Sequence, residues 1–379
     1  MPSDVGSVVR SVLIVSNGRG EDAVGAAVAS LLRRAAAVEA FPLAGLGEIY
    51  GDIPLVEPRR ELPSGGFALR GGIGALLPDL RAGGLGLWRR QRDALKARAG
   101  LDQVVVVVGD AYALWMGAVA RTPIVFVATA KSESTEGHRA LEIMIMRRHA
   151  RTVFTRDART ADALRRRHVE ARFAGNPLVD VIPEPAGALP IPPRAPVVLL
   201  LPGSRADALR NMTVLLRLCR RVAEHEPAIF VAALPPALEM ARLVREAVAA
   251  RWAIDGTFLR SPTAAVLLTR DFGSAVRRAT VVVGLAGTAN EQAAALGIPV
   301  VAFAPAGAVQ YRAAFMHLQH RLLGDALVPA ADWEGAAETT IRLLRDAGER
   351  ARRGAAGRER MGPPGAIPVI ASEVEQRLR

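Results

Sequence analysis

Two short apolar runs in the second half of the chain end in turns of small residues, and each turn opens a predicted helix. The run Val197–Leu201 is followed by Pro202-Gly203-Ser204-Arg205, and the run Val281–Val283 is followed by Gly287-Thr288-Ala289-Asn290-Glu291-Gln292. A turn of this kind offers unpaired backbone N–H groups and the positive end of a helix dipole to an anion. Two such turns in one half of the chain predict a pocket for a diphosphate. This indicates an enzyme that uses a nucleotide-activated substrate.

The side chains of both turns suit such a ligand. Gly203 allows the backbone to approach a phosphate, the Ser204 hydroxyl caps the helix or donates to an oxygen, and Arg205 can form paired charge-assisted bonds. In the second turn, Thr288 and the N–H groups after it would meet phosphate, and the acidic or amide residue of the first helical turn would bond ribose hydroxyls. The alternative is a pair of ordinary strand-to-helix turns, with a surface arginine and an acid that complements the helix dipole.

Short valine-rich runs alternate with helical segments along the chain, which is typical of α/β domains with parallel sheets. A length of 379 residues suits two domains. The proline-dense segment 183–196 ends regular structure and marks the boundary. We expect domains at 1–185 and 186–350 and a helical tail at 351–379. Strands are predicted at 11–15, 38–42, 103–108, 124–127, 152–155 and 171–174, and then at 197–201, 229–233, 265–268, 280–283 and 299–304; helices are predicted at 23–34, 139–149, 158–167, 208–224 and 272–279.

Composition excludes several classes of protein. The single cysteine, Cys219, rules out an internal disulfide or a thiolate zinc cluster, and the histidines show no metal-ligand spacing, so we expect no metal. No apolar run reaches the roughly 20 residues of a membrane span, and the N-terminus lacks a signal-peptide pattern, so we expect a cytoplasmic protein. The net charge of +12 fits an anionic membrane surface or substrate, or an arginine-rich proteome. Aromatic residues make up 4% of the chain, which argues against nucleic acid as a partner.

The segment 65–90 mixes apolar side chains with glycine and arginine and ends near a tryptophan. This composition suits a segment that lies in a membrane interface. The alternative is a glycine-rich loop and helix that pack on the core. The candidate membrane-contact residues are Phe67, Ile73, Leu76, Leu77, Leu87 and Trp88.

Two loops in the first half carry further candidate site residues. The loop after the first strand reads Asn17-Gly18-Arg19-Gly20-Glu21-Asp22, which is a weak dinucleotide fingerprint but suits a loop that faces an interdomain cleft. The acids of this loop are otherwise simple helix caps. Asp110 follows the run 104–108, and a carboxylate at the carboxyl end of a buried parallel strand can act as a general base toward a sugar hydroxyl. Its alternative role is the N-cap of the next helix.

Together these motifs resemble lipid-A-disaccharide synthase, and more closely a family of bacterial proteins related to that synthase. The resemblance rests on Gly109-Asp110-Ala111, the segment 175–180, Leu201-Pro202-Gly203-Ser204-Arg205, Gly287-Thr288-Ala289 and Gly297-Ile298-Pro299. It implies a GT-B fold, in which two Rossmann-like domains face each other across a cleft and the C-terminal helix crosses back to the N-terminal domain. The first domain would bind the acceptor and the second the nucleotide sugar.

The resemblance also implies a reaction: inverting transfer, without metal or cofactor, from a UDP-sugar to a lipid-linked acceptor at the inner face of the cytoplasmic membrane. Asp110 falls on the aspartate proposed as the catalytic base in that family, and Arg205 on its motif arginine. The segment 65–90 falls where the family contacts the membrane. Asn176 stands where the synthase has histidine, and Gln292, one place after Glu291, stands where it has glutamate.

Two other readings of the same motifs remain open. A UDP-GlcNAc 2-epimerase-like enzyme would share the fold and the paired turns, but it would need several acid and base side chains around the sugar and no membrane-facing loop. A catalytically silent protein that binds a nucleotide sugar or a lipid would keep the turns without using Asp110 as a base.

Overall fold

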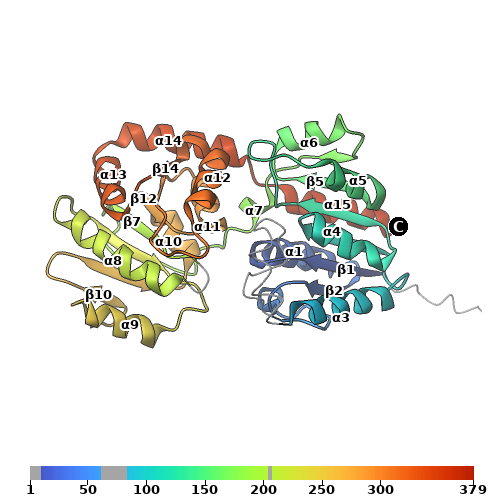
Figure 1. The fold of residues 1–379 in the computed structure, drawn as a ribbon, viewed down its shortest axis with the longest axis horizontal. Helices are drawn as coiled ribbons and strands as arrows, with labels where there is room; N and C mark the ends of the chain where they lie inside the picture. Colours follow the sequence, from blue (N-terminus) through green and yellow to red (C-terminus); the bar gives the residue numbers. More distant parts are fainter. Residues whose placement is uncertain (1–9, 61–82, 204–206) are drawn as a thin grey trace, which may run out of the picture. The chain divides into compact units, whose positions relative to one another are not determined.

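The computed structural model describes residues 10–60, 83–203 and 207–379, which divide into two compact units. Unit 1 comprises residues 1–181 together with 364–379, and unit 2 comprises residues 182–363. Each unit is a layered α/β domain with helices on its sheet (Figure 1). The proline-dense segment 183–196 contains no helix or strand, as predicted, and it lies at the start of unit 2.

The described residues of unit 1 form a six-stranded sheet in the order β2-β1-β3-β4-β5-β6, in which all paired strands are parallel. The strands are β1 (Ser11–Ser16), β2 (Ala37–Pro42), β3 (Val104–Gly109), β4 (Ile124–Ala128), β5 (Ala150–Thr155) and β6 (Ala171–Arg172). The helices are α1 (Arg19–Leu32), α3 (Gly84–Ala97), α4 (Ala111–Gly117), α5 (Ala140–His149), α6 (Ala158–Arg165), α7 (Pro177–Asp180) and α15 (Ala366–Arg377), with short 3₁₀ turns η1 (Glu48–Tyr50) and η3 (Ala118–Ala120).

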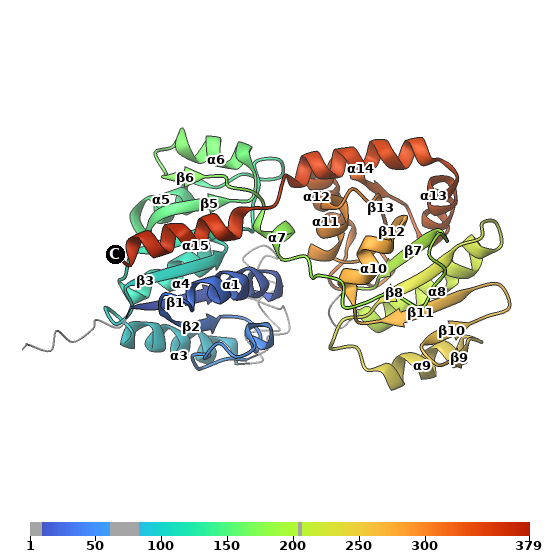
Figure 2. The same cartoon turned by 180° about the vertical axis from the view of Figure 1, so that it is seen from behind.

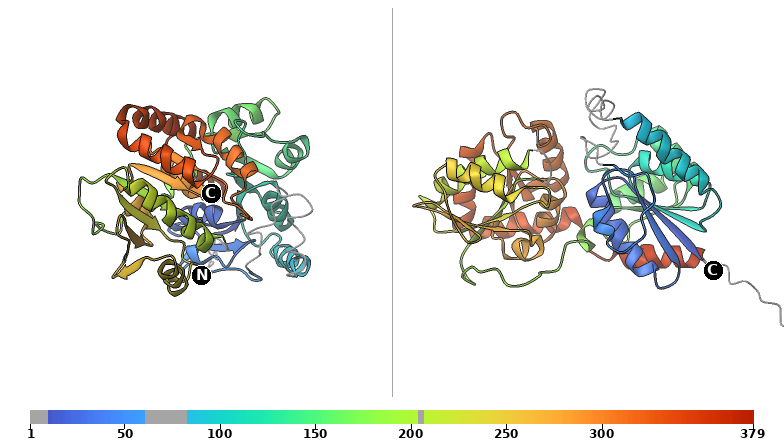
Figure 3. Two further views of the ribbon diagram at one scale, coloured as in Figure 1. Left: turned by 60° about the vertical axis from the view of Figure 1, so that its left-hand side comes forward. Right: turned by 90° about the horizontal axis from the view of Figure 1, so that it is seen from below.

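Both faces of this sheet are buried, which explains the uninterrupted apolar runs. In β3, Val104, Val106 and Val108 pack into one hydrophobic cluster, whereas Val105 and Val107 pack into a second cluster on the opposite face. Residues of α1 and α15 complete the first cluster, and residues of α3, α4 and α5 complete the second. Figure 2 shows α1 and α15 across one face of the sheet, and Figure 3 shows α3 on the opposite side from α15.

The described residues of unit 2 form an eight-stranded sheet in the order β14-β13-β12-β7-β8-β11-β10-β9. The strand β10 pairs antiparallel with both β9 and β11, and the other pairs are parallel. The strands are β7 (Val197–Leu201), β8 (Ile229–Ala233), β9 (Ala253–Asp255), β10 (Phe258–Arg260), β11 (Ala265–Thr269), β12 (Val281–Gly284), β13 (Val300–Ala302) and β14 (Leu327–Pro329). The helices are α8 (Ala208–Ala223), α9 (Met240–Ala249), α10 (Phe272–Arg278), α11 (Thr288–Ala295), α12 (Ala313–Leu323), α13 (Trp333–Arg345) and α14 (Ala347–Met361), with a 3₁₀ turn η4 (Gly324–Ala326).

The C-terminal tail divides between the two units, whereas the sequence analysis expected all of 351–379 to pack on the first domain. The helix α14 packs on α11 and α12 of unit 2, and only α15 packs on α1 of unit 1. Glycine explains this packing. A Cβ added at Gly354 would lie 2.1 Å from the carbonyl oxygen of Gly297, and one added at Gly357 would lie 2.3 Å from that of Ala294. The missing side chains therefore let α14 approach the end of α11 closely.

The sequence analysis predicted a membrane-interface segment at 65–90. Of this segment the structure describes residues 83–90, and residues 84–90 belong to the helix α3. Leu87, a predicted membrane contact, is 1% exposed and belongs to the core of unit 1. Trp88 is partly buried against the second hydrophobic cluster and stacks on Trp115, with ring centroids 6.1 Å apart and planes at 8°. The packing alternative therefore holds for these two residues, and the membrane prediction is wrong for Leu87. Phe67, Ile73, Leu76 and Leu77 lie outside the described residues.

The packing of α15 on unit 1 gives a stability prediction. Replacing Ile370, which is fully buried, with alanine should destabilise unit 1 by about 2–5 kcal/mol through lost burial and the cavity left behind. The neighbouring variant Val369→Ala, at a side chain 45% exposed, should cost less than about 0.5 kcal/mol. Hydrogen exchange in denaturant, read on β3 for unit 1 and on β7 for unit 2, measures both. Equal losses in the two variants would contradict this packing.

Candidate functional site

The first sheet reverses its strand order between β1 and β3. The chain leaves β1 toward β2 on one side, and β3 lies on the other side of β1. In open parallel sheets, ligands bind outside the carboxyl ends of the strands at such a switch point. Asn17 and Gly18 follow β1, and Asp110 follows β3. The predicted residues of the two loops therefore lie together at the position where this fold places its chemistry.

One hydrogen bond joins the two loops. The Asn17 side-chain nitrogen donates to Asp110 Oδ1 over 3.3 Å. The backbone at Gly109 has a φ of 144°, a conformation that favours glycine, and a Cβ added there would be in ordinary contact with that of Asn17, at 3.5 Å. Gly18, with a φ of 137°, is the N-cap of α1, and Gly20 lies in its first turn.

Asp110 is also the N-cap of α4. Its Oδ1 accepts from the backbone N–H of Ala113 over 3.0 Å. This is the alternative role considered in the sequence analysis, and the capping bond fixes the carboxylate at the carboxyl edge of the sheet. A capping role and a catalytic role are compatible, because a carboxylate oxygen can accept several hydrogen bonds.

Two buried groups extend this edge beyond the predicted residues. Thr129, directly after β4, donates through its hydroxyl to Glu21 Oε1 at 3.5 Å. Arg156, directly after β5, is buried, and its guanidinium donates to the carbonyl oxygen of Thr129 over 3.2 Å. Sequence reasoning missed Arg156, although an arginine directly after a buried strand is the available signal.

Asn176, the last predicted residue of unit 1, is buried as the N-cap of α7 and accepts from the N–H of Leu178 over 3.1 Å.

A chain of buried hydroxyl and carboxyl groups lies beneath the first loop. The Tyr50 hydroxyl donates to Ser16 Oγ over 2.8 Å, and the Ser16 hydroxyl donates to Asp22 Oδ1 over 2.6 Å. Asp22 is only 3% exposed, and burial raises its pKa from 3.8 to about 7, against the lowering effects of the Ser16 hydrogen bond and the Arg19 charge. Burial also raises the pKa of the Tyr50 hydroxyl. Neither acid of the loop is the helix cap that the sequence suggested as an alternative.

The second sheet has its own switch point, between β7 and β12. The strands β8 and β11 lie on one side of β7, and β12, β13 and β14 lie on the other. The two predicted diphosphate turns follow β7 and β12 and are therefore neighbours. The N–H of Leu285 donates to the carbonyl oxygen of Leu201 over 2.8 Å. At Gly203, φ is 89° and an added Cβ would lie 2.8 Å from the Leu285 carbonyl oxygen. Ser204 and Arg205 lie outside the described residues.

Buried side-chain amides hold the second turn in place. Asn290, which is fully buried, donates to the carbonyl oxygen of Gly284 over 3.1 Å and to Gln319 Oε1 over 2.9 Å. Gln319 in turn donates to the carbonyl oxygen of Gly287 over 3.0 Å, and the Tyr311 hydroxyl donates to Gln319 Oε1 over 2.7 Å. These bonds make Asn290 a support for the turn, although the sequence analysis placed it in the binding set. Gln292 is buried too, whereas Gly287, Thr288, Ala289 and Glu291 are partly exposed.

The turn after β7 is anchored from α8. Asn211 donates to the carbonyl oxygen of Pro202 over 2.9 Å. Asp207 accepts from the N–H groups of Val309 and Gln310, over 2.8 and 3.0 Å, and from Arg210 over 2.5 Å. The start of α8 is thereby tied to the loop that follows β13. The structure thus places the turns of Gly203 and Gly287 next to each other, and side-chain hydrogen bonds hold both turns in place.

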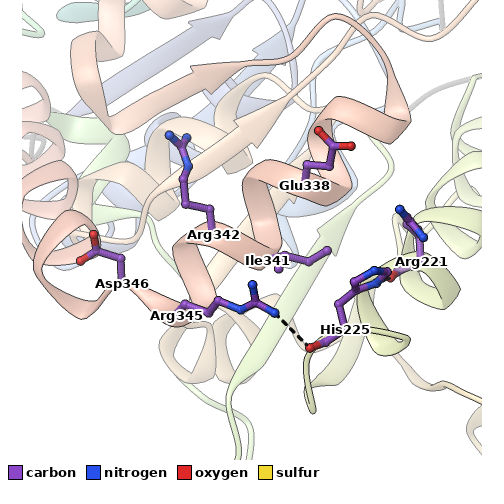
Figure 4. Close-up of a pocket in the computed structure, with 7 residues that line it drawn as sticks. All are labelled: Arg221, His225, Glu338, Ile341, Arg342, Arg345 and Asp346. Atoms are coloured by element: carbon purple, nitrogen blue, oxygen red, sulfur yellow. Dashed lines mark hydrogen bonds between the residues drawn. The ribbon is translucent and has the colours of Figure 1, made fainter.

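A pocket of about 360 Å³ between α8 and α13 is a separate feature of unit 2 (Figure 4). It is lined by the C-terminal part of α13 and by Arg221 and His225 at the end of α8, the end farthest from the β7 turn. Its arginines are engaged by protein groups, and Arg345 donates to the His225 carbonyl oxygen over 3.4 Å. This pocket therefore does not belong to the candidate site. In the described part of the chain, no group of three or more His, Cys, Asp or Glu side chains is placed to hold a metal ion.

Three solved structures resemble the chain over almost its whole length. CalG4, the calicheamicin glycosyltransferase, has a TM-score of 0.62 at 16% identity and covers 98% of both chains. A putative UDP-N-acetylglucosamine 2-epimerase from Listeria monocytogenes has a TM-score of 0.61 at 15% identity, covering 97% of this chain and 95% of its own. MnaA from S. aureus, in a co-structure with UDP, has a TM-score of 0.61 at 13% identity with the same coverage.

The fold is therefore GT-B: two Rossmann-like α/β domains, each with a predominantly parallel sheet. At these identities the likeness shows the fold alone. No protein-family model and no curated protein matches the chain.

The buried Asp22 gives a prediction on pH. The folded protein holds the Asp22 proton up to a pH of about 7, whereas the unfolded chain releases it near its ordinary pKa of about 4. Unfolding is therefore increasingly favoured as the pH rises from about 4 to 7, by at most about 4 kcal/mol from this group. The variant Asp22→Asn should remove this part of the slope and be the more stable form above pH 7. Urea denaturation of unit 1 at several pH values measures it.

A matched control for Asp22→Asn is Glu48→Gln, at an exposed acid of the same unit whose side chain is 70% exposed. It should leave the pH slope unchanged. A slope that Asp22→Asn does not alter would show that Asp22 is ionised in the fold at pH 5–6.

Proposed function

We propose that the protein is an inverting glycosyltransferase that needs no metal or cofactor and moves a sugar from a UDP-sugar to a lipid-linked acceptor. The observation that carries the proposal is the adjacency of the β7 and β12 turns at the switch point of the second sheet. Backbone N–H groups at the start of α11 and the glycine backbone at Gly203 suit the two phosphates of a nucleoside diphosphate. The likeness to a glycosyltransferase and to a protein seen with UDP supports this assignment.

The chemistry divides between the units. Asp110 in unit 1 takes the proton of the acceptor hydroxyl, whose oxygen attacks the anomeric carbon of the donor sugar. The bond from that carbon to the diphosphate oxygen breaks, and UDP leaves with the bonding electron pair. Attack from the face opposite the leaving group inverts the anomeric centre. The negative charge that develops on the diphosphate is stabilised by the turns of unit 2 and by Arg205.

The acceptor and the site of action follow from the resemblance to the lipid-A-disaccharide-synthase-related family. We propose a cytoplasmic protein that works at the inner face of the cytoplasmic membrane, with an anionic membrane surface as partner. The net charge of +12 supports attraction to anionic lipid. In the described residues, no helix combines the length and the hydropathy needed to cross a membrane.

The second candidate is a UDP-GlcNAc 2-epimerase-like enzyme. The likeness to the epimerase from Listeria monocytogenes favours it as strongly as the likeness to CalG4 favours transfer. Conversion of UDP-GlcNAc without any acceptor would establish this reaction and exclude the transferase. A protein that binds UDP but converts no donor with membrane lipid extract would be the silent binding protein.

The β7 turn generates a prediction on nucleotide binding. The variant Gly203→Ala should weaken UDP binding at least about tenfold, because the new Cβ would displace the Leu285 carbonyl and open the turn. Gly256→Ala is the matched control, since Gly256 has a φ of 58° in the same unit but open space around the position of a Cβ. It should keep the affinity within about twofold. Calorimetric titration with UDP decides, and equal effects of both variants would refute a diphosphate site at this turn.

Asp110 generates a prediction on catalysis. Asparagine is as good an N-cap as aspartate, so Asp110→Asn should keep the α4 cap, the thermal stability and the UDP affinity. It should lower the transfer rate by at least about 100-fold, because an amide cannot accept the proton. The assay uses a labelled UDP-sugar and membrane lipid extract. Unchanged transfer would leave Asp110 with only its capping role.

A further inference from the structure

A second, basic pocket lies in unit 1 at the amino edge of the first sheet. It has a volume of about 260 Å³ and lies at the first residues of β4 and β5, whereas the candidate site lies at the carboxyl edge. Four arginines and a histidine line it, and no acidic residue does: Arg121, Arg147, Arg148, His149 and Arg151.

None of these four guanidinium groups forms an ion pair or hydrogen bond with a described residue. The contrast with the pocket between α8 and α13 is direct. There Arg221 pairs with Glu224 over 3.5 Å, Arg342 pairs with Glu349 over 3.7 Å, and Arg345 pairs with Glu226. The positive charge of the basic pocket is thus left uncompensated by the described residues, whereas that of the other pocket is neutralised.

A register shift in the sheet places one of these arginines at the pocket. The pairing of β4 with β5 shifts, so that Ile124 faces Ala150 but Val125 faces Thr152, and Arg151 is the extra residue of a β-bulge. A bulge redirects side chains and commonly occurs next to a functional site. Arg121 has a φ of 52°, the left-handed conformation with which it ends the helical segment of α4 and η3.

A purely structural role explains only part of the cluster. Arg147 and Arg148 lie in the last turn of α5, where cations favourably interact with the helix dipole. Arg121 is the C-cap of η3, which continues α4, so a helix end accounts for its charge as well. Arg151 lies in β5 and has no such role. The pKa of His149 is lowered by burial and then by the charge of Arg148, so the arginines alone supply the positive charge near neutral pH.

We propose that this basic pocket binds a phosphate-bearing anion with more than one negative charge. Guanidinium groups bind phosphate oxygens through paired hydrogen bonds, and several unpaired guanidinium groups around one small cavity favour a multivalent anion. The ligand is either a soluble phosphorylated molecule or the headgroup of an anionic phospholipid. This binding is independent of the diphosphate site proposed in unit 2.

The test compares two charge-matched double variants. Arg121→Gln/Arg151→Gln removes two unpaired charges of the basic pocket, and Arg221→Gln/Arg342→Gln removes two paired charges of the other pocket. Inorganic pyrophosphate is titrated calorimetrically at 0.1 M salt, with saturating UDP present so that the proposed donor site is filled. The first variant should weaken pyrophosphate binding at least about tenfold and leave UDP binding unchanged, and the second should change neither by more than about twofold.

Vesicles identify the source of the anion. Co-sedimentation with phosphatidylglycerol vesicles, against phosphatidylcholine vesicles, should show the same dependence on Arg121 and Arg151 if the ligand is a headgroup. Pyrophosphate binding without vesicle binding identifies a soluble ligand. If Arg121→Gln/Arg151→Gln fails to fold, Arg147→Gln/Arg148→Gln replaces it.

Equal losses of binding in both double variants would show that only the net charge matters and would overturn the proposal. A wild type that binds neither pyrophosphate nor phosphatidylglycerol vesicles would overturn it too. A wild type that fails to bind UDP would count against the proposed function alone. The same titration of the two double variants, run without UDP, would still show whether the basic pocket binds pyrophosphate.

Discussion

The reversal of strand order in each sheet is the constraint on which the candidate site residues of each unit depend. The carboxyl ends of all parallel strands lie at one edge of the sheet. Where neighbouring strands connect in the same direction, their loops leave no crevice between them. Only where successive connections depart in opposite directions do two loops meet with open space between them. In unit 1 this brings Asn17 to Asp110, and in unit 2 it brings Gly203 to the loop after β12. Which reaction or ligand each sheet supports then depends on a few residues in these neighbouring loops.

Different interactions make the two edges rigid. In unit 2, amide groups of Asn290 and Gln319 bond the backbone carbonyls of the β12 turn, which fixes its conformation without placing a charge there. In unit 1, a helix cap fixes Asp110, and a hydroxyl chain connects Tyr50 through Ser16 to Asp22. Neutral supports suit a turn that must accept an anion, and the buried carboxylate near the β7 turn, that of Asp207, is compensated by Arg210 and two backbone N–H groups. A fixed carboxylate suits an edge that must accept a proton.

The strands of both sheets could be predicted from sequence because buried parallel strands are uniformly apolar, as in Val197–Leu201, whose predicted and observed bounds agree. The strands β9, β10 and β14 were missed, since each has only three residues and all three of β9 are exposed, so no long apolar run marks them. The helix α3 was expected only as the alternative to a membrane segment and without bounds, because its first turn is rich in glycine. The sequence predicted that the two turns form one pocket, and the strand order of the second sheet, which was not predicted, makes them neighbours.

The supporting side chains could not be predicted in the same way. Gln319 lies 29 residues beyond Asn290, and Tyr50 lies 34 residues beyond Ser16, so no local spacing marks either pair. The tail was misassigned for a related reason. Gly354 and Gly357 read as weak helix positions, whereas their function is to allow close contact with the end of α11, which only the fold reveals.

The distribution of arginine bears on the meaning of the net charge of +12. An arginine-rich proteome would supply the residue wherever a surface cation is tolerated, and such residues would find carboxylates at random. Arg221, Arg342 and Arg345 follow that expectation, since each pairs with a glutamate. Arg121 and Arg151 do not, because both line a cavity without acids and pair with no carboxylate of a described residue, and Arg151 lies at a bulge. Positive charge that is gathered at one cavity and left unpaired by the described residues is more readily explained by an anionic ligand than by composition.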